Sequence, residues 1–323
     1  MSVLKQRSEI LFLYDVSWGN PNGDPVDENK PRIDEETSRN IVTDVRLKRT
    51  VRDFLYHHKG QEIFIREISD EKDYIQDAKT RAEDFLKKDG RLVKKTDVKS
   101  LAEMKQIIKD NILSSCIDVR LFGGTLPVEK SSSEKSSITY TGPVQFKMGS
   151  SMHRVKMEYL KGTGAFASGK DQTRKTFREE YVLPYSLISF YGIVNEQAAK
   201  STHLTEDDVQ LLLEAMWVGT KNLISRSKMN HVPRLLLRVI YNEPYFHIGE
   251  LDKRLNLQFK KSDEELRDVS DFVIDLNELV KELDKYRVRI DRIECAIDER
   301  LQSNISLVDE LKQRGFIVDV KVW

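Results

Sequence analysis

The sequence predicts an α+β protein with a ferredoxin-like core that is enlarged by insertions. Three observations lead to this fold class. Short apolar runs typical of strands alternate with two amphipathic segments typical of helices. Their order along the chain is strand, helix, strand, a long insertion, further strands, helix and strand, which fits a ferredoxin-like core. The stretches between them are rich in charge or in turn-forming residues, as surface insertions are.

The first predicted element is a strand in the apolar run Ile10–Tyr14, which a cluster of turn residues follows. Such a bounded run predicts a largely buried central strand. The cluster is Asn20–Pro25, with the sequence Asn-Pro-Asn-Gly-Asp-Pro. Its two prolines fix φ and Gly23 accepts a positive φ, so we expect a defined loop. A simple turn is the alternative, because these residue types dominate turns.

Residues 41–57 have the periodicity of an amphipathic helix, with Thr37 or Ser38 as the expected cap. Its apolar positions are Leu47, Val51 and Phe54. Basic residues recur on another face, at Arg46, Arg49 and Arg52, with Lys48 between them. A basic stripe is most often a solvated surface. Because this stripe follows a polar loop at a strand end, we favour contact with phosphate groups.

An inserted region is expected after this helix. Residues 61–68 are predicted to form a second strand, and the charged residues 71–99 an exposed helix and loop. Residues 101–112 carry apolar side chains at helical spacing. The serine-rich stretch 131–137 is expected to be a mobile polar link.

The second half of the core follows this insertion. Three further runs are strand-like, namely residues 141–148, 181–194 and 232–241. A helix is expected to open at Thr205 and to continue through Trp217, with acids in its first turn. Residues 245–323 are predicted to add an acidic α/β region that ends in a strand at residues 316–320.

The charges balance overall but not along the chain. Lys and Arg number 53, as do Asp and Glu, so the formal net charge is zero. Residues 144–178 nevertheless contain eight basic and two acidic side chains, and residues 221–238 contain five basic and no acidic ones. Acids gather between residues 263 and 282. We therefore expect a cationic and an anionic face, which would suit nucleic acid and the stacking of subunits.

Composition also bears on location and chemistry. No apolar stretch has the length of a membrane span, and the first residues lack the apolar region of a signal peptide, so we expect a cytoplasmic protein. Only Cys116 and Cys295 are present, which predicts no disulfide framework and no cysteine-based zinc site.

Two motifs for chemistry are weak. Residues 164–170 have the spacing of a phosphate-binding P-loop, but Asp171 stands where a hydroxyl is needed and no apolar strand precedes the motif. A flexible basic hairpin is favoured over nucleotide hydrolysis. Four carboxylates could hold a metal ion for phosphodiester cleavage, namely those of Asp15, Asp24, Asp27 and Asp44. Loop and helix-surface aspartates are more often structural, so this remains the alternative.

The segment Ser225–His231 lies between the second helix and the strand that follows it. It offers hydroxyl, guanidinium, ammonium and amide donors together. This mixture suits phosphate and sugar groups without reading bases. A solvated helix end, whose basic residues complement the helix dipole, is the equal alternative.

Several blocks, in the same order, resemble CRISPR-associated protein family 7, the backbone subunits of Cascade surveillance complexes. The blocks are Asn20–Pro25, Pro31–Asp34, Val42–Arg49, Asp118–Gly123, Thr141–Phe146 and Ser225–Lys228. The resemblance spans roughly residues 8 to 241 and is specific as a set, because separate motifs agree in order. The fourth and fifth blocks look closer to the type I-B branch than to the I-C branch.

The resemblance implies a hand-like, RNA-recognition-motif-like architecture and no chemistry of its own. The implied parts are a palm (residues 8–68, 116–156 and 179–245), helical fingers (69–115), a β-hairpin thumb (157–178) and a C-terminal extension (246–323). Several copies would form a helical filament on one CRISPR RNA in antiviral defence. Other Cascade subunits, the target DNA strand and a recruited helicase-nuclease would be further partners.

We therefore predict a non-enzymatic RNA-binding protein without metal or cofactor. The predicted RNA-binding residues are Asn20, Asn22, Asp24, Arg46, Lys48, Arg49, Gln145, Lys147, Ser151, His153, Lys170, Arg174, Ser225, Arg226 and Lys228. They would hold the guide by its backbone, because its bases must stay available for pairing. The rival prediction is a metal-dependent RNA endonuclease that uses Asp24 or Asp44.

Overall fold

The computed structural model describes residues 2–69, 75–167 and 175–323. Residues in contact group into two compact units. Unit 1 comprises residues Met1–Arg7, Val51–Gln145 and Ile193–Ala215, and unit 2 comprises Ser8–Thr50, Phe146–Gly192 and Met216–Trp323. Each unit is described by itself below.

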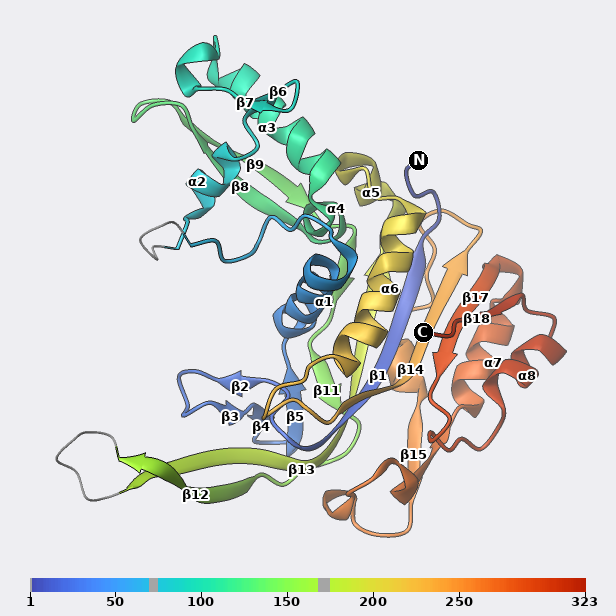
Figure 1. Cartoon of the computed structure of the whole chain (residues 1–323). Helices are drawn as coiled ribbons and strands as arrows, with labels where there is room; N and C mark the ends of the chain where they lie inside the picture. The colour runs from blue at the N-terminus through green and yellow to red at the C-terminus, as the bar shows by residue number, and fades with distance from the viewer. Residues whose placement is uncertain (1, 70–74, 168–174) are drawn as a thin grey trace. The chain divides into compact units, whose positions relative to one another are not determined.

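Unit 2 is built on a large, mostly antiparallel sheet with the strand order β18-β17-β14-β1-β13-β11-β5-β4 (Figure 1). The strands are β1 (Ser8–Gly19), β4 (Ile33–Asp34), β5 (Arg39–Val42), β11 (Gly149–Ser151), β13 (Lys175–Val194), β14 (His231–Tyr241), β17 (Ile290–Ile297) and β18 (Val318–Val320). β17 and β18 are paired in parallel. The pairs β1–β14, β11–β13, β5–β11, β14–β17 and β4–β5 are antiparallel. The chain thus has the mixed α and β architecture that the sequence predicts.

The predicted first strand is confirmed as β1 and lies at the centre of this sheet. Residues 10–13 are fully buried, which explains the continuous apolar run. β1 pairs antiparallel with β14, with Val16 opposite His231. The two motif-bearing segments that adjoin these strand ends are therefore brought to the same place, although some 200 residues separate them in sequence.

The polar residue Glu9 anchors the acidic C-terminal region to the centre of the sheet. Its carboxylate accepts hydrogen bonds from the hydroxyls of Tyr191 and Tyr241. It also accepts bonds from the backbone N–H groups of Ile248 and Gly249, each at 2.8 Å. Burial and the nearby carboxylate raise the pKa of both tyrosines. This buried acid is therefore satisfied from four sides, as a buried charge must be.

Two helices directly follow or precede strands of this sheet in the sequence. α1 (Asp44–Lys59) follows β5, and α6 (Glu206–Lys221) precedes β14. The expected cap at residues 37 or 38 was wrong, because residues 39–42 form β5. α1 instead begins after Thr43, whose Oγ1 accepts the backbone N–H of Arg46 at 3.3 Å. The predicted cap of α6 is confirmed, since Thr205 Oγ1 accepts the N–H of Asp208.

Unit 1 contains the inserted helices together with a hairpin. Its elements include α2 (Ala78–Glu83), β6 (Lys87–Lys88), β7 (Arg91–Leu92), η1 (Lys95–Asp97), α3 (Leu101–Ser115), α4 (Ile117–Phe122), β8 (Gly123–Glu129), β9 (Lys135–Thr141) and α5 (Glu196–Thr202). Met104, Ile108 and Ile112 of α3 share one core with Leu126 and Val128 of β8. The serine-rich stretch expected as a mobile link is wrong in its second half, where β9 pairs with β8 along its full length.

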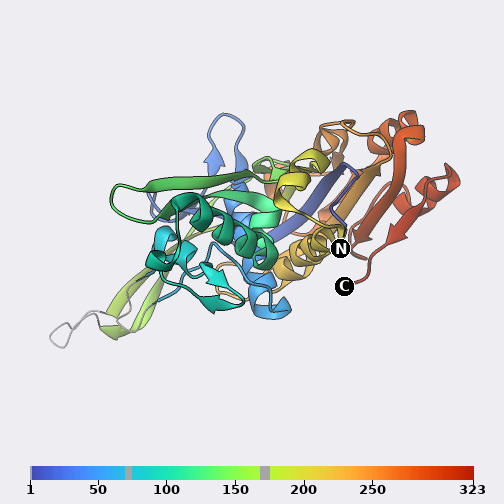
Figure 2. The same cartoon turned by 90° about the horizontal axis from the view of Figure 1, so that it is seen from above.

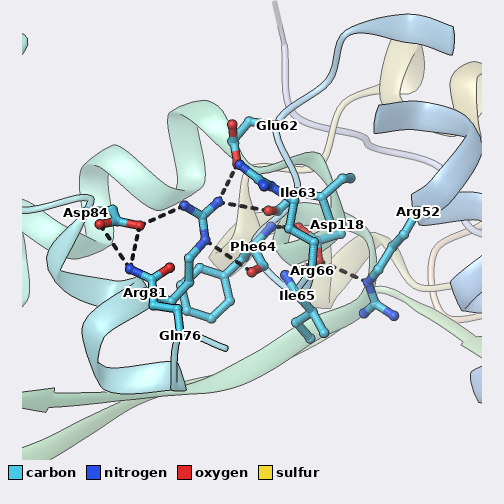
Figure 3. A network of polar contacts seen from close by, with 10 residues as sticks. All are labelled: Arg52, Glu62, Ile63, Phe64, Ile65, Arg66, Gln76, Arg81, Asp84 and Asp118. Atoms are coloured by element: carbon cyan, nitrogen blue, oxygen red, sulfur yellow. Dashed lines mark hydrogen bonds and ion pairs between the residues drawn. The ribbon is translucent and has the colours of Figure 1, made fainter. Parts of the chain in front are cut away.

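The strand predicted at residues 61–68 is also wrong. The segment makes a single bridge, between Glu62 and Cys116. Its backbone is satisfied by the carboxylate of Asp118 instead, which accepts the N–H groups of Phe64 at 2.8 Å and Ile65 at 3.1 Å (Figure 3). Asp118 is fully buried and also accepts Nε of Arg52 at 3.0 Å.

Arg81 completes this network from α2. It donates to the carboxylates of Glu62 and Asp84, the latter at 3.1 Å (Figure 3). It also donates to the backbone oxygens of Ile63 at 2.9 Å and Phe64 at 3.3 Å. The guanidinium group thus ties an irregular segment to a helix that belongs to the same unit.

The C-terminal region adds short elements to unit 2. They are η2 (Leu251–Arg254), β15 (Asn256–Phe259), η3 (Asp263–Glu265), η4 (Val269–Asp271), β16 (Phe272–Asp275), α7 (Asn277–Lys285), η5 (Arg287–Arg289) and α8 (Leu307–Gln313), besides β17 and β18. The predicted final strand is confirmed, though only over its last three residues. No helix of the described ranges has the length and apolarity needed to cross a membrane.

A long hairpin occupies the segment predicted as a thumb. β12 (Glu158–Ala167) pairs antiparallel with the first part of β13, and the two strands are drawn in yellow-green in Figure 2. Tyr159 lies opposite Tyr181. The predicted contacts at Lys170 and Arg174 lie outside the described residues. Three short strands remain. β2 (Gly23–Asp24) pairs with β3 (Lys30–Pro31), and β10 comprises Val144–Phe146.

Candidate nucleic-acid interface

Two loops meet where β1 ends and β14 begins. The backbone N–H of Ser17 donates to the oxygen of Asn230 at 3.2 Å, and the N–H of Asn20 donates to the oxygen of Ser227 at 2.8 Å. Nζ of Lys228 donates to the backbone oxygen of Asn20 at 2.9 Å. The predicted loop at residues 20–24 and the predicted loop at residues 225–228 therefore form one structure.

Close approach of the two backbones requires a glycine at position 19. A Cβ atom placed there would lie 2.9 Å from the backbone oxygen of Ser227 and 3.0 Å from a methyl group of Val16. Real side chains do not fit at such a distance from a backbone atom. Gly19 thus explains how the loop after β1 packs against the loop before β14.

Asparagine side chains fix the first loop from within. Asn20 is buried, and its Nδ2 donates to the backbone oxygen of Asn29 at 2.6 Å. Oδ1 of Asn22 accepts both the N–H and the hydroxyl of Thr43, each at 2.8 Å. Because Thr43 also caps α1, the loop is held directly against the first turn of that helix. The loop is defined, as predicted, and the simple-turn alternative is not needed.

Arg46 and Lys228 form the charged part of this site, which we call the cation cluster. Burial, together with the positive charge of Arg46, lowers the pKa of the half-buried Lys228 to about 8. Nη2 of Arg46 donates to the hydroxyl of Thr50 at 3.1 Å. A lysine held beside a second cation favours a bound anion, because an anion would stabilise its charged form.

Two stacked, uncharged aromatic rings, those of His231 and Tyr14, adjoin the cation cluster. His231 is buried, and burial together with Lys228 and Arg46 lowers its pKa to about 3, so the ring is neutral at physiological pH. It stacks on Tyr14 with ring centroids 5.8 Å apart. Burial raises the pKa of Tyr14. The positive charge of the site therefore resides on Arg46 and Lys228.

Two of the predicted RNA-binding side chains are corrected. Ser151 is buried, donates its hydroxyl to the oxygen of His153 at 2.6 Å and accepts the N–H of Asn40 at 2.9 Å. His153 is buried as well, and its Nε2 accepts the N–H of Leu187 at 3.1 Å. Burial lowers its pKa. Both side chains are used inside unit 2 and present no polar group to a ligand.

Several other predicted residues have partners within the chain. The pairs are Asp24 with Arg32 (2.8 Å), Lys48 with Asp44 (2.9 Å), Lys147 with Asp252 (3.1 Å), Arg226 with Glu180 (2.6 Å) and Gln145 with the oxygen of Gly142 (2.9 Å). Arg49 is exposed on α1, and Ser225 is exposed in the second loop. Asp24 also accepts the N–H of Val26 and so orders its own loop.

The geometry gives no support to the endonuclease alternative. Each of its two candidate carboxylates, Asp24 and Asp44, is in an ion pair with a basic side chain. Over residues 2–69, 75–167 and 175–323, no three His, Cys, Asp or Glu side chains gather in a way that could hold a metal ion.

Sequence reasoning missed Thr43 and Tyr14. A signal for Thr43 was present, since a threonine directly before an amphipathic segment is a frequent cap. Tyr14 carried no signal beyond its apolar run. Its stacking on His231 depends on the register of β1 and β14, which separate parts of the sequence set.

The fold and this site define a mixed α/β protein with a cationic loop junction suited to anionic chains. Residues 6–277 match the family described as CRISPR-associated protein Cas7. The chain is also 35% identical, over 316 residues, to the CRISPR-associated protein Cas7 of Haloferax volcanii (strain DS2), covering 93% of this chain and 89% of that one. The chain therefore belongs to the Cas7 family, and the resemblance found in the sequence is confirmed.

A solved structure shows the same fold at low sequence identity. It is a chain of a CRISPR RNA-guided surveillance complex in a pre-nicking state, with a TM-score of 0.52 and 14% identity. The match covers 96% of this chain and all of the other. The assignment to the type I-B branch stays a prediction.

Proposed function

We propose that this chain is a backbone subunit of a type I CRISPR surveillance complex (Cascade). It polymerises along a CRISPR RNA guide in the cytoplasm and holds the guide for pairing with target DNA. The observation that carries the proposal is the cation cluster, in which Lys228 is held beside Arg46 at the junction of two ordered loops. Membership of the Cas7 family supports it.

The grip is on the sugar-phosphate backbone. Cationic and amide groups bind phosphate and sugar oxygens without reading sequence. The cation cluster supplies the charge, while Arg49 and Ser225 are exposed on the two elements that meet there. A guide must keep its base edges available for the target strand, so a backbone grip suits RNA-guided recognition.

The central strands serve as an RNA-recognition-motif-like palm. The chain order β1, α1, β11, β13, α6, β14 together with the sheet order β14-β1-β13-β11 supports this assignment, because it is the arrangement of a ferredoxin-like fold. The helices of residues 69–115 serve as fingers. The β12–β13 hairpin serves as the thumb, and residues 246–323 are an extension of the palm.

The subunit is not an enzyme on this proposal. Further copies of the chain, other Cascade subunits and a recruited helicase-nuclease complete the machine. The single chain provides a filament on which guide and target pair. Incubation with labelled RNA and magnesium should therefore leave the RNA intact.

The proposal is tested by binding of single-stranded RNA at several salt concentrations. Log affinity should fall linearly with log salt, and replacing Arg46 and Lys228 by Ala should reduce the slope by about 0.7 for each lost contact. Guides of unrelated spacer sequence should bind within a few-fold of each other. An unchanged slope in the folded double variant, or a strong preference for one spacer, would contradict the backbone grip.

The thumb assignment needs an assembly assay. Replacing residues 162–175 by a short Gly/Ser linker should leave the melting temperature close to that of the parent, because surface insertions add little to core stability. Size-exclusion chromatography with guide RNA should then show only small complexes. Normal filaments would refute the thumb, and an unfolded product would place the segment in the core.

A further inference from the structure

Trp18 is an exposed tryptophan at the junction of the two loops. It is the penultimate residue of β1, and 53% of its surface is exposed. Its φ is 48°, a value that side-chain-bearing residues seldom adopt and that costs on the order of 1–3 kcal/mol. A large apolar ring kept in water by a strained backbone is unfavourable for the free protein. Such strain is found most often where a ligand binds.

The hydrogen bonds on either side of Trp18 hold it in this conformation. The N–H of Ser17 is bonded to Asn230, and the N–H of Asn20 is bonded to Ser227. Trp18 lies between these two anchors, so its backbone belongs to the junction. Its side chain is exposed to solvent there.

The loop that meets the backbone around Trp18 carries both apolar side chains and a positive charge. Met229 and Ile224, on the second loop and just before it, are both exposed. Lys228 donates to the backbone oxygen of Asn20, two residues after Trp18. An aromatic side chain and a cation on the same loop junction fit a nucleotide, whose base can stack while its phosphate is neutralised. A purely apolar partner would leave the lysine unused.

We propose that Trp18 is a stacking platform for one unpaired base of a single-stranded RNA whose adjoining phosphate is held by Lys228. The inference deepens the proposed function and rests on it. Stacking engages the face of a base and not its pairing edge, and every base has such a face. The contact therefore adds affinity without spacer preference, which agrees with a backbone grip.

Two changes separate the base contact from the phosphate contact. Trp18→Leu removes the aromatic face and keeps an apolar side chain, whereas Lys228→Met removes the charge and keeps the apolar stem. Each variant binds two RNAs of equal length, one with all its bases and one in which abasic residues replace every base. Trp18→Phe, which keeps an aromatic ring, serves as the conservative variant.

Tyr245 offers a matched control. It is also an exposed aromatic residue at positive φ, with 68% of its surface exposed and a φ of 63°. It follows the C-terminal end of β14, whereas the junction lies at the N-terminal end of that strand. Tyr245→Leu should therefore alter binding of neither RNA. Thermal melting of all variants checks that each is folded.

We expect Trp18→Leu to weaken binding of base-bearing RNA roughly five- to 150-fold and to leave abasic RNA unaffected. Trp18→Phe should recover most of the loss, and Lys228→Met should weaken both RNAs alike. Equal losses on the two RNAs for Trp18→Leu, or no loss on either, would overturn the stacking proposal. Unchanged binding by Lys228→Met would instead refute the phosphate contact and, with it, the grip proposed above.

Discussion

One basic side chain in each unit, Arg81 in unit 1 and Lys228 in unit 2, illustrates two opposite uses of positive charge. In unit 1, Arg81 donates to Glu62 and Asp84 and to two backbone oxygens, so its charge is neutralised where it lies. In unit 2, Lys228 is half-buried, and the charged group that shifts its pKa is a second cation, Arg46. The guanidinium group of Arg81 stabilises the fold, whereas the ammonium group of Lys228 destabilises the free protein.

The difference separates charges that stabilise the fold from charges that bind a ligand. A buried ion pair is strongly coupled, because removal of one partner leaves the other uncompensated. A lysine kept against burial and like charge destabilises the free protein and favours an anion. Sites of this second kind are where function and stability are in conflict.

The largest expected effect is the loss of Asp118. Asp118→Ala removes the acceptor for Arg52 and for the N–H groups of Phe64 and Ile65, so the free energy of unfolding should fall by about 3–5 kcal/mol in urea denaturation. The control is Asp110→Ala on exposed α3 surface, which should cost about 0.5 kcal/mol or less. A loss below about 1 kcal/mol would show that the network does not hold this segment.

The next largest effect is expected for Lys228, whose loss should reduce RNA binding but not stability. Lys228→Met should weaken RNA binding roughly tenfold or more, because a hydrogen bond to a charged group contributes about 1.5–3 kcal/mol. The RNA-free protein should melt at the same temperature or higher, because a desolvated charge has been removed. Lys260→Met, at an exposed position, should change neither quantity. A lower melting temperature for Lys228→Met would place Lys228 among the residues that hold the fold.

Titration of Lys228 should produce a smaller, graded effect. With a pKa of about 8, this lysine is charged at pH 7 and largely neutral at pH 9, so RNA affinity should fall across that range. In the unfolded chain its pKa is about 10.4. Between pH 8 and about 10.4 the unfolded state binds the extra proton, so this group makes stability rise with pH. Lys228→Met should lack both trends when binding and unfolding are measured at matched pH.

The smallest effect should come from Lys48, a predicted RNA contact that is already paired with Asp44 at 2.9 Å. Because its charge is largely neutralised, Lys48→Met should weaken RNA binding by less than about threefold. It should lower the free energy of unfolding by about 0.5 kcal/mol. Filter binding measures the RNA affinity of Lys48→Met and Lys228→Met side by side. Equal losses for the two variants would mean that pairing within the chain does not decide which cation binds RNA.

The sequence predicted what local patterns determine. The buried run at Ile10–Tyr14, the helix at residues 101–112 and the cap at Thr205 depend on neighbours in the chain, and all three are confirmed. The run at Ile63–Ile65 is apolar enough for a strand. Its backbone partner is the carboxylate of Asp118, more than 50 residues away, which no local pattern reveals.

The site was predicted in part for the same reason. The loops at residues 20–24 and 225–228 could be recognised separately by their residue types. Their union depends on the register of β1 against β14 and on the close approach at Gly19. Ser151 and His153 were misjudged, because residue type alone does not tell whether a polar side chain on a short strand (Ser151) or just after it (His153) faces inward, and here both are buried.

The position of β1 also bears on how the chain is made. Its two sheet neighbours, β13 and β14, begin only at Lys175 and His231. At about 5–20 residues per second, a ribosome needs on the order of ten to thirty seconds after β1 to supply the first of them. Throughout that interval a strand with a continuous apolar run has neither of its sheet neighbours, and it is exposed to aggregation and to chaperones. Placing the earliest strand at the centre of the sheet makes the centre close late in synthesis.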